Sequence, residues 1–259
     1  MKKEKAKIIC VTSNKGGVGK TFITTSLAGI YQKLGKKVLI IDLDLFFGGI
    51  AASLNVDVNK TIYHLADDFS NNRYKHINDY ICVYDENIHI LSACKDPRNG
   101  NKIEARYIDL ILQQVSLLYD VVLVDTSHDL GECKLLVLDR CDMTLFVITN
   151  DLLDLKNTKS VMSIFKDAEN KDYKILLNNS LWPNKSYYTD YDIKFIIKSQ
   201  VDYTLSNSFY IKNIDKVIAR GKIAITDSPR LVSKKELKKF TNMAKDLIGE
   251  GNKKSEVGK

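Results

Sequence analysis

The segment from residue 7 to residue 21 constrains the fold of this chain more than any other part of the sequence. An apolar run, Lys7–Thr12, is followed by the stretch Lys15-Gly-Gly-Val-Gly-Lys-Thr21 and then by a helical pattern. Glycines remove the Cβ atoms that would keep a phosphate away from backbone N–H groups, and a helix N-terminus adds partial positive charge. The segment therefore predicts a strand, a phosphate-binding loop and a helix, in that order.

Each position of this loop has an expected part in binding. The residues expected to bind the nucleotide are Gly16, Gly17, Val18, Gly19, Lys20 and Thr21. Lys20 is expected to reach the β- and γ-phosphates, and the hydroxyl of Thr21 is expected to ligate Mg²⁺. The alternative is a glycine turn with incidental lysines, and the strand and helix patterns on either side argue against it.

The rest of the chain alternates apolar runs of strand length with helical patterns. Strands are predicted at Lys7–Thr12, Lys37–Leu43, Asn87–Ala93, Asp120–Asp125, Met143–Thr149, Tyr173–Asn178 and Val201–Leu205. Helices are predicted at Lys20–Leu34, Lys102–Tyr119, Asp154–Asp167, Ile211–Arg220 and Lys234–Ile248. Because these strands are apolar throughout, we expect an α/β fold of three layers, with a mostly parallel central sheet and helices on both faces. One domain is expected over residues 1–249, followed by a lysine-rich polar tail at 250–259.

Composition and charge exclude several classes of protein. The 259 residues are 44% hydrophobic and 27% charged, which excludes a disordered or low-complexity chain. Residues 1–7 carry four lysines and one glutamate, and residues 233–259 carry eight lysines and four acidic residues, so the two ends account for the whole net charge of +7. Since the remainder is neutral, we do not expect a nucleic-acid partner.

The lengths of the apolar runs and the spacing of the cysteines indicate the cellular compartment and the redox state of the thiols. No apolar run approaches the roughly 20 residues of a membrane span, and the apolar stretch 8–11 is too short for a secretion signal. The five cysteines form no C-x-x-C pair, as is typical of reduced thiols. We therefore expect a cytoplasmic protein, and we do not expect Cys94 and Cys133 to ligate an iron–sulfur cluster.

Aspartates, which suit metal-assisted phosphate chemistry, end two of the predicted strands. Asp42 and Asp44 lie at positions i and i+2, so both side chains are expected to project toward the phosphates and Mg²⁺. Such a pair orients water for phosphoryl transfer, although Asp-x-Asp alone also occurs as a simple cap at a strand end. Asp125 follows the apolar residues 121–124 and is expected to deliver a carboxylate to the Mg²⁺ shell.

One departure within the phosphate loop is informative. The usual pattern has glycine six residues before its lysine, where this chain has Asn14, and a second lysine, Lys15, precedes the glycines. The loop resembles the deviant Walker A motif of the MinD/ParA family of ATPases. The resemblance implies a P-loop NTPase fold, ATP and Mg²⁺ as cofactors, and hydrolysis of ATP to ADP and phosphate. It also implies that Lys15 is a signature lysine that reaches the partner's phosphates in an ATP-dependent homodimer.

The same resemblance assigns the catalytic set. It makes Asp44 the carboxylate tied to hydrolysis and Asp42 its support, with Lys15 and Lys20 acting on the phosphates. Family members commonly have Asp-Thr-Pro where this chain has Asp-Thr-Ser at 125–127. His128 follows, and we expect it to occupy an exposed loop position rather than to sense the γ-phosphate.

The adenine end of the site rests on the resemblance as well. Asn178 ends the strand 173–178, and the corresponding family residue faces the adenine edge, with which an amide can pair through two hydrogen bonds. The segment 205–208 would then offer backbone contacts to the base. Neighbouring Asn179 is the less favoured candidate, and a simple turn role for Asn178 is the alternative.

Three stretches resemble the CpaE/TadZ branch, whose ATPases help to place Flp (tight-adherence) pilus machinery: residues 42–48, 124–130 and 149–157. We therefore expect a slow, dimerising ATPase switch that helps to localise or assemble a pilus secretion machine at the inner membrane. A division-site ATPase, a DNA-partition ATPase and a nucleotide-binding scaffold with negligible turnover are the alternatives. Two features depart from the branch: the first strand begins by residue 7, leaving no room for a receiver-like domain before it, and Lys20 is present where many members lack it.

The predicted C-terminal helix, Lys234–Ile248, has two interpretations. Its apolar residues recur every three to four positions and lysines occupy much of the remainder. Such a helix either lies on an anionic membrane or packs on its own sheet with its lysines in water. The stripe is short and lacks tryptophan, so packing is expected, and peripheral contact with the inner face of the cell membrane stays open.

Overall fold

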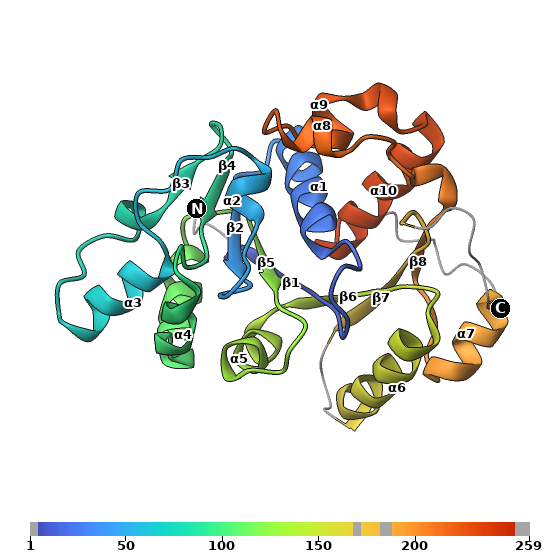
Figure 1. Cartoon of the computed structure of the whole chain (residues 1–259), viewed down its shortest axis with the longest axis horizontal. Coiled ribbons are helices and arrows are strands. Elements are labelled where there is room, and N and C mark those ends of the chain that lie inside the picture. The colour runs from blue at the N-terminus through green and yellow to red at the C-terminus, as the bar shows by residue number, and fades with distance from the viewer. Residues whose placement is uncertain (1–4, 168–171, 182–187, 252–259) are drawn as a thin grey trace.

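An eight-stranded sheet forms the central layer of the computed structural model, which describes residues 5–167, 172–181 and 188–251 (Figure 1). The strands are β1 (Lys7–Thr12), β2 (Val38–Leu43), β3 (Cys82–Val83), β4 (Ile88–Leu91), β5 (Val121–Thr126), β6 (Met143–Ile148), β7 (Tyr173–Asn178) and β8 (Tyr203–Leu205). Their order is β3-β4-β2-β5-β1-β6-β7-β8. Only β3 runs antiparallel to its neighbour among the described strands, so the expected parallel α/β fold is confirmed.

Helices cover both faces of this sheet (Figure 1). One face carries α1 (Lys20–Lys33), α2 (Ile50–Ser53), α8 (Asp215–Ile218), α9 (Ala224–Asp227) and α10 (Lys234–Leu247). The other carries α3 (Ile62–Ser70), α4 (Ala105–Val115), α5 (Glu132–Arg140), α6 (Leu152–Asp167) and α7 (Asp190–Ile197). Short 3-10 turns span Ile77–Tyr80, Pro97–Lys102, Asn207–Phe209 and Pro229–Leu231.

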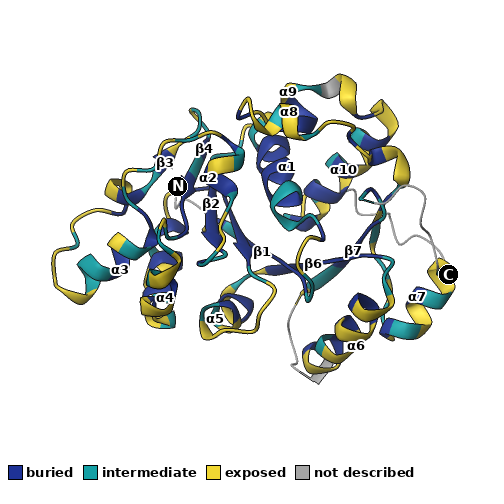
Figure 2. Cartoon of the chain, viewed as in Figure 1, coloured by how far each residue is buried: buried dark blue, intermediate teal, exposed yellow. Residues whose placement is uncertain are grey.

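The strand residues explain why two helical layers are needed. Along β1, Ile8 and Cys10 contribute to the core on one face, whereas Ile9 and Val11 contribute to the core on the other. Side chains alternate between faces along a strand, so a strand that is apolar throughout must be covered on both. Figure 2 shows the buried sheet between helices whose outer faces are exposed.

Several helix boundaries differ from the sequence prediction. The helix expected over 102–119 spans only Ala105–Val115, and residues 97–102 form a separate 3-10 turn that Asp96 caps by accepting from the Arg98 N–H. The helix expected over 211–220 shrinks to Asp215–Ile218, since Asn213 takes a left-handed φ of 58°. The sequence prediction also missed five helices and one strand: α2, α3, α5, α7, α9 and β3.

The C-terminal helix α10 packs on the sheet, as expected. Its stripe of Phe240, Met243, Ala244 and Leu247 is buried, and the Tyr31 hydroxyl of α1 donates to the Ala244 carbonyl over 2.8 Å. Among the described residues, no helix combines the length and the apolar character needed to cross a membrane. Most of the predicted lysine-rich tail, from residue 252 onward, lies outside the described residues.

Candidate nucleotide site

The phosphate loop occupies residues 13–19, at the carboxyl end of β1. Gly17 and Gly19 take left-handed φ values of 73° and 93°, which residues with a Cβ rarely adopt. A Cβ on Gly19 would also lie 2.8 Å from Nδ2 of Asn178, so the space requires glycine as well. Val18 is buried in the core, which leaves its backbone as the part able to meet a ligand.

The first turn of α1 leaves its backbone donors uncapped. The N-cap residue is Gly19, no side chain caps the helix there, and the first turn contains no acidic residue. The first N–H groups of a helix have no partner within the helix, and its N-terminus carries a partial positive charge. This helix start is therefore a site for an anion.

Lys20 places a desolvated ammonium group beside this helix start. Its Nζ donates to Oγ of Ser13 over 2.9 Å, and that hydroxyl donates to the Lys15 carbonyl over 2.7 Å. Burial lowers the pKa of Lys20, and the negative charges of Asp125 and Asp44 oppose that shift. An incoming phosphate would compensate the same charge with a stronger, charge-assisted partner.

Thr21 and Asp125 meet as expected for a magnesium site. The Thr21 hydroxyl donates to one oxygen of Asp125 over 2.8 Å, and Thr24 donates to the other over 3.2 Å. Burial raises the pKa of Asp125 to about 6, against the hydrogen bond from Thr21 and the charge of Lys20. The described residues hold no cluster of three metal-ligating side chains. The hydroxyl and carboxylate oxygens of Thr21 and Asp125 are the ligand type that Mg²⁺ takes together with phosphate oxygens and water.

The structure separates the two aspartates at the end of β2. Asp42 is buried, and its carboxyl oxygens accept the N–H groups of Ile50 over 3.1 Å and Asp44 over 3.2 Å. Asp44 lies one residue past the strand, is partly exposed and accepts the Phe47 N–H over 3.2 Å. Asp42 thus holds the loop 44–50 in place, and Asp44 is the carboxylate that remains available at its surface.

Lys15 is paired with the residue that immediately precedes a neighbouring helix. Its Nζ lies 3.1 Å from Oδ1 of Asp151, immediately before α6, and the lysine side chain is 36% exposed. Asp151 also accepts the N–H of Asp154, whose own carboxylate accepts from the N–H and the hydroxyl of Thr149. The loop after β6 is therefore built to present one carboxylate to Lys15.

Asn178 is bound to the phosphate loop itself. Its Nδ2 donates to the Val18 carbonyl over 2.9 Å, and its Oδ1 accepts from the N–H and the hydroxyl of Ser180. These contacts tie the end of β7 to the loop. The proposed contact with adenine stays a prediction, as does the one for the backbone of 205–208.

His128 is exposed, as expected, and it also lies beside the phosphate loop. A Cβ built on Gly16 would be 3.9 Å from its Nδ1. Sequence reasoning missed four further residues of the site: Ser13, Thr24, Lys134 and Asp151. Thr24 carried a usable signal, because a helical spacing of three places it on the same face as Thr21.

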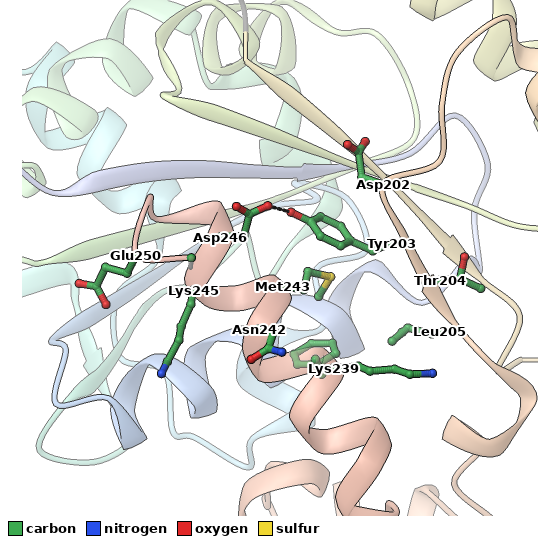
Figure 3. Close-up of a pocket in the computed structure, with 12 residues that line it drawn as sticks. Asp202, Tyr203, Thr204, Leu205, Lys239, Asn242, Met243, Lys245, Asp246 and Glu250 are labelled. Carbon is green, nitrogen blue, oxygen red and sulfur yellow. Dashed lines mark hydrogen bonds between the residues drawn. The ribbon is translucent and has the colours of Figure 1, made fainter. Parts of the chain in front are cut away.

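A pocket of about 720 Å³ lies elsewhere, between β8 and α10 (Figure 3). Tyr203 and Asp246 face each other across it and are hydrogen-bonded, and Asn242 and Glu250 lie on its helical side. No residue of the phosphate loop and neither Asp44 nor Asp125 lines it. The candidate nucleotide site, at the helix start and the strand ends, is therefore separate from this pocket.

Comparison with known proteins decides the family. A family described as an AAA domain matches residues 6–181, more than half of the chain. The chain belongs to that family. Its relatives are MinD/ParA ATPases, so the resemblance of the phosphate loop is confirmed at the level of the family. These comparisons do not reach the CpaE/TadZ branch.

Three relatives show how far the sequence similarity extends. An uncharacterised ATP-binding protein of Methanocaldococcus jannaschii is 27% identical over 57% of this chain and 55% of its own length. The septum site-determining protein MinD of Helicobacter pylori is 24% identical over 63% of this chain and 60% of its own length. The chromosome-partitioning ATPase Soj of Thermus thermophilus is 26% identical over 88% of this chain and 87% of its own length. The chain thus spans less than two thirds of the first two relatives.

Solved structures confirm the fold of this MinD/ParA-type domain. A ParA family ATPase from Chlorobium tepidum superposes with a TM-score of 0.77 at 20% identity, covering 93% of this chain and 98% of its own. MinD of Pyrococcus horikoshii, solved with Mg-ADP, has a TM-score of 0.76 at 22% identity, covering 93% and 96%. The expected P-loop NTPase fold is therefore confirmed.

Asp42 generates a prediction about pH. Burial and the nearby Asp125 raise its pKa from 3.8 to about 8, so the folded state holds this proton more tightly than the unfolded chain. Its stabilising contribution is full below pH 3.8 and is lost as the pH rises through about 8, by up to about 1.4 kcal/mol per pH unit. We predict that the nucleotide-free protein unfolds at lower temperature at pH 8 than at pH 5, and that Asp42→Asn reduces this difference.

The control is Asp215→Asn, which removes an exposed carboxylate on α8. Thermal unfolding of the three proteins across pH 5–8 is the measurement. The same pH dependence in Asp42→Asn as in the wild type would contradict the assignment.

Proposed function

We propose that this protein is an ATP-dependent molecular switch that binds Mg²⁺-ATP, dimerises in that state and hydrolyses the nucleotide slowly. One observation carries the proposal. Lys20, Thr21 and Asp125 converge on the uncapped start of α1, which is a site for an anion with an adjacent divalent cation. Basal turnover is expected well below the ~10 s⁻¹ of a median enzyme, since a switch must persist until its partner acts.

Some residues of the chain would bind the phosphates and the metal ion, and others would take part in hydrolysis. Bound Mg²⁺-ATP supplies the transferable phosphoryl group and the divalent charge that neutralises it. Lys20, now bonded to Ser13, would hold the phosphates, and Thr21 and Asp125, now bonded to each other, would hold the metal ion. Asp44 orients the attacking water, and Asp42 fixes the loop that carries it.

Dimerisation would depend on Lys15. In the single chain its ammonium is paired with Asp151 at the surface. A partly exposed ion pair is worth little in free energy, about 0–1 kcal/mol, so triphosphate oxygens of a second copy compete with it easily. Lys15 is therefore available to cross a homodimer interface once both copies hold ATP.

For the cellular role, we propose that the switch helps to localise or assemble a Flp pilus secretion machine. The support is the resemblance of residues 42–48, 124–130 and 149–157 to the CpaE/TadZ branch. The protein would act in the cytoplasm and meet the inner face of the membrane through that machine.

The second candidate is a division-site or DNA-partition ATPase. The names of the relatives support it, since they include a septum site-determining protein and a chromosome-partitioning ATPase. Gene neighbourhood separates the two candidates. A secretion ATPase and a prepilin peptidase beside the gene support the pilus, and a centromere-binding partner supports partition.

A pair of lysine substitutions tests the switch. We predict that Lys20→Ala loses nucleotide affinity, by about tenfold or more, because it removes a buried charge from the phosphates. Lys15→Ala should keep its affinity within a few fold and lose the ATP-dependent shift from monomer to dimer. Calorimetric titration and light scattering with Mg²⁺-ATP measure the two effects. Full ATP-dependent dimerisation of Lys15→Ala would remove Lys15 from the interface.

Asp44 provides a test of turnover. We predict that Asp44→Ala binds ATP and stays dimeric for longer than the wild type, because binding survives while the attacking water loses its orienting group. Phosphate release should fall about 100-fold. Asp57→Ala, a substitution of an exposed aspartate, is the control. A phosphate-release rate equal to that of the wild type would exclude Asp44 from the chemistry.

A further inference from the structure

A buried lysine lies behind the nucleotide site and has no part in the mechanism described so far. Lys134, on α5, is 4% exposed. Its Nζ donates to the backbone carbonyl of Ser13 over 3.1 Å and to that of Ser127 over 3.2 Å. Lysine is almost never fully buried unless it is paired, so this placement needs a reason.

The two carbonyls belong to the two loops that flank the expected γ-phosphate. Ser13 opens the phosphate loop, and its hydroxyl accepts the hydrogen bond from Lys20. Ser127 lies two residues after Asp125, at the start of the loop 127–131 that leads into α5. One ammonium group therefore joins the beginning of the phosphate loop to the segment that follows the metal-binding aspartate.

Packing alone does not account for a lysine here. The neighbouring buried positions of α5, Val137 and Leu138, are apolar, and methionine would fill similar space without desolvating a charge. Burial lowers the pKa of Lys134 to about 8, so the group is largely protonated at neutral pH. The charged or titratable groups that face it are Cys10 on β1, Lys20 on α1 and Asp129 in the loop.

We propose that Lys134 is a positioning residue that couples the phosphate loop to the loop 127–131, so that phosphate binding is transmitted to the metal-binding side of the site. The chain of contacts is continuous: Lys20 holds the Ser13 hydroxyl, and Lys134 holds the Ser13 and Ser127 carbonyls. When Lys20 turns toward phosphate, Ser13 loses one restraint, and Lys134 links that change to residue 127. The coupling of phosphate binding to residue 127 rests on the proposed function. The two hydrogen bonds by which Lys134 joins the loops do not depend on it.

The test compares Lys134→Met with a matched control, Lys33→Met. Lys33 on α1 also donates from Nζ to a backbone carbonyl, that of Thr226, but outside the nucleotide site. Amide hydrogen exchange of the nucleotide-free proteins measures directly whether the hydrogen bonds from Lys134 restrain the loop 127–131. In Lys134→Met, the amides of residues 127–131 should exchange about tenfold faster than in the wild type, and those of α10 should not change.

The steady-state constants kcat and KM test whether the phosphate loop and the loop 127–131 are coupled through Lys134. With Mg²⁺-ATP, Lys134→Met should lower kcat about tenfold or more with KM within about threefold of the wild type, because the reacting geometry is lost while the phosphate contacts stay. Lys134→Arg, which keeps the charge and the donors, should recover most of kcat. Lys33→Met should match the wild type in both measurements.

Three results would overturn the inference. Unchanged exchange at 127–131 in Lys134→Met would show that the bridge does not hold the loop. A fall in thermal stability with kcat unchanged would show a merely structural lysine. If Lys134→Met does not fold, Lys134→Gln, whose shorter neutral side chain cannot hold both carbonyls, takes its place, and unchanged exchange at 127–131 in that variant would contradict the bridge. Failure of the wild type to bind ATP would instead contradict the proposed function and leave the exchange test in force.

Discussion

The uncapped N-terminus of α1, with the ammonium group of Lys20 beside it, is the constraint on which the rest of the site depends. The first turn has no side-chain cap and no carboxylate, and the partly desolvated Lys20 has a neutral hydroxyl, that of Ser13, as its hydrogen-bonding partner. A parallel sheet brings the ends of β1, β2 and β5 to one edge, where the pairings of Val11 and Asp42 with Asp125 hold them together. The fold thus concentrates hydrogen-bond donors and positive charge at one edge of the sheet, an arrangement that suits an anion.

The two buried carboxyl groups of the site, those of Asp42 and Asp125, have raised pKa values but different hydrogen-bond partners. Burial raises the pKa of Asp42 to about 8 and that of Asp125 to about 6, so each carboxyl group binds a proton more tightly than an exposed aspartate does. Their hydrogen bonds differ, because Asp42 accepts from backbone N–H groups of its own loop, whereas Asp125 accepts from the hydroxyl groups of Thr21 and Thr24. These bonds fit Asp42 to a structural role, whereas the side-chain donors on Asp125 are consistent with the proposed Mg²⁺ site.

Sequence reasoning found the parts of the site that are contiguous in the chain and missed those that the fold assembles. The phosphate loop is a local motif, and all seven long strands were predicted from their apolar runs. Lys134 and Asp151 come from loops and helices far away in the sequence, and α5 escaped notice because it buries a lysine and leaves Leu135 about half exposed. The side chains of Asp42 and Asp44 were expected to project the same way at a spacing of two, yet the strand ends at Leu43 and the chain turns beyond it.

A crystal structure with Mg²⁺ and a non-hydrolysable ATP analogue tests the central claim most directly. The account predicts that the phosphates lie against the backbone of residues 15–21, that Lys20 leaves Ser13 for a phosphate oxygen, and that the 2.8 Å bond from Thr21 to Asp125 is replaced by a metal ligand. A nucleotide bound elsewhere, such as between β8 and α10, with Lys20 still on Ser13 and Thr21 still on Asp125, would contradict it.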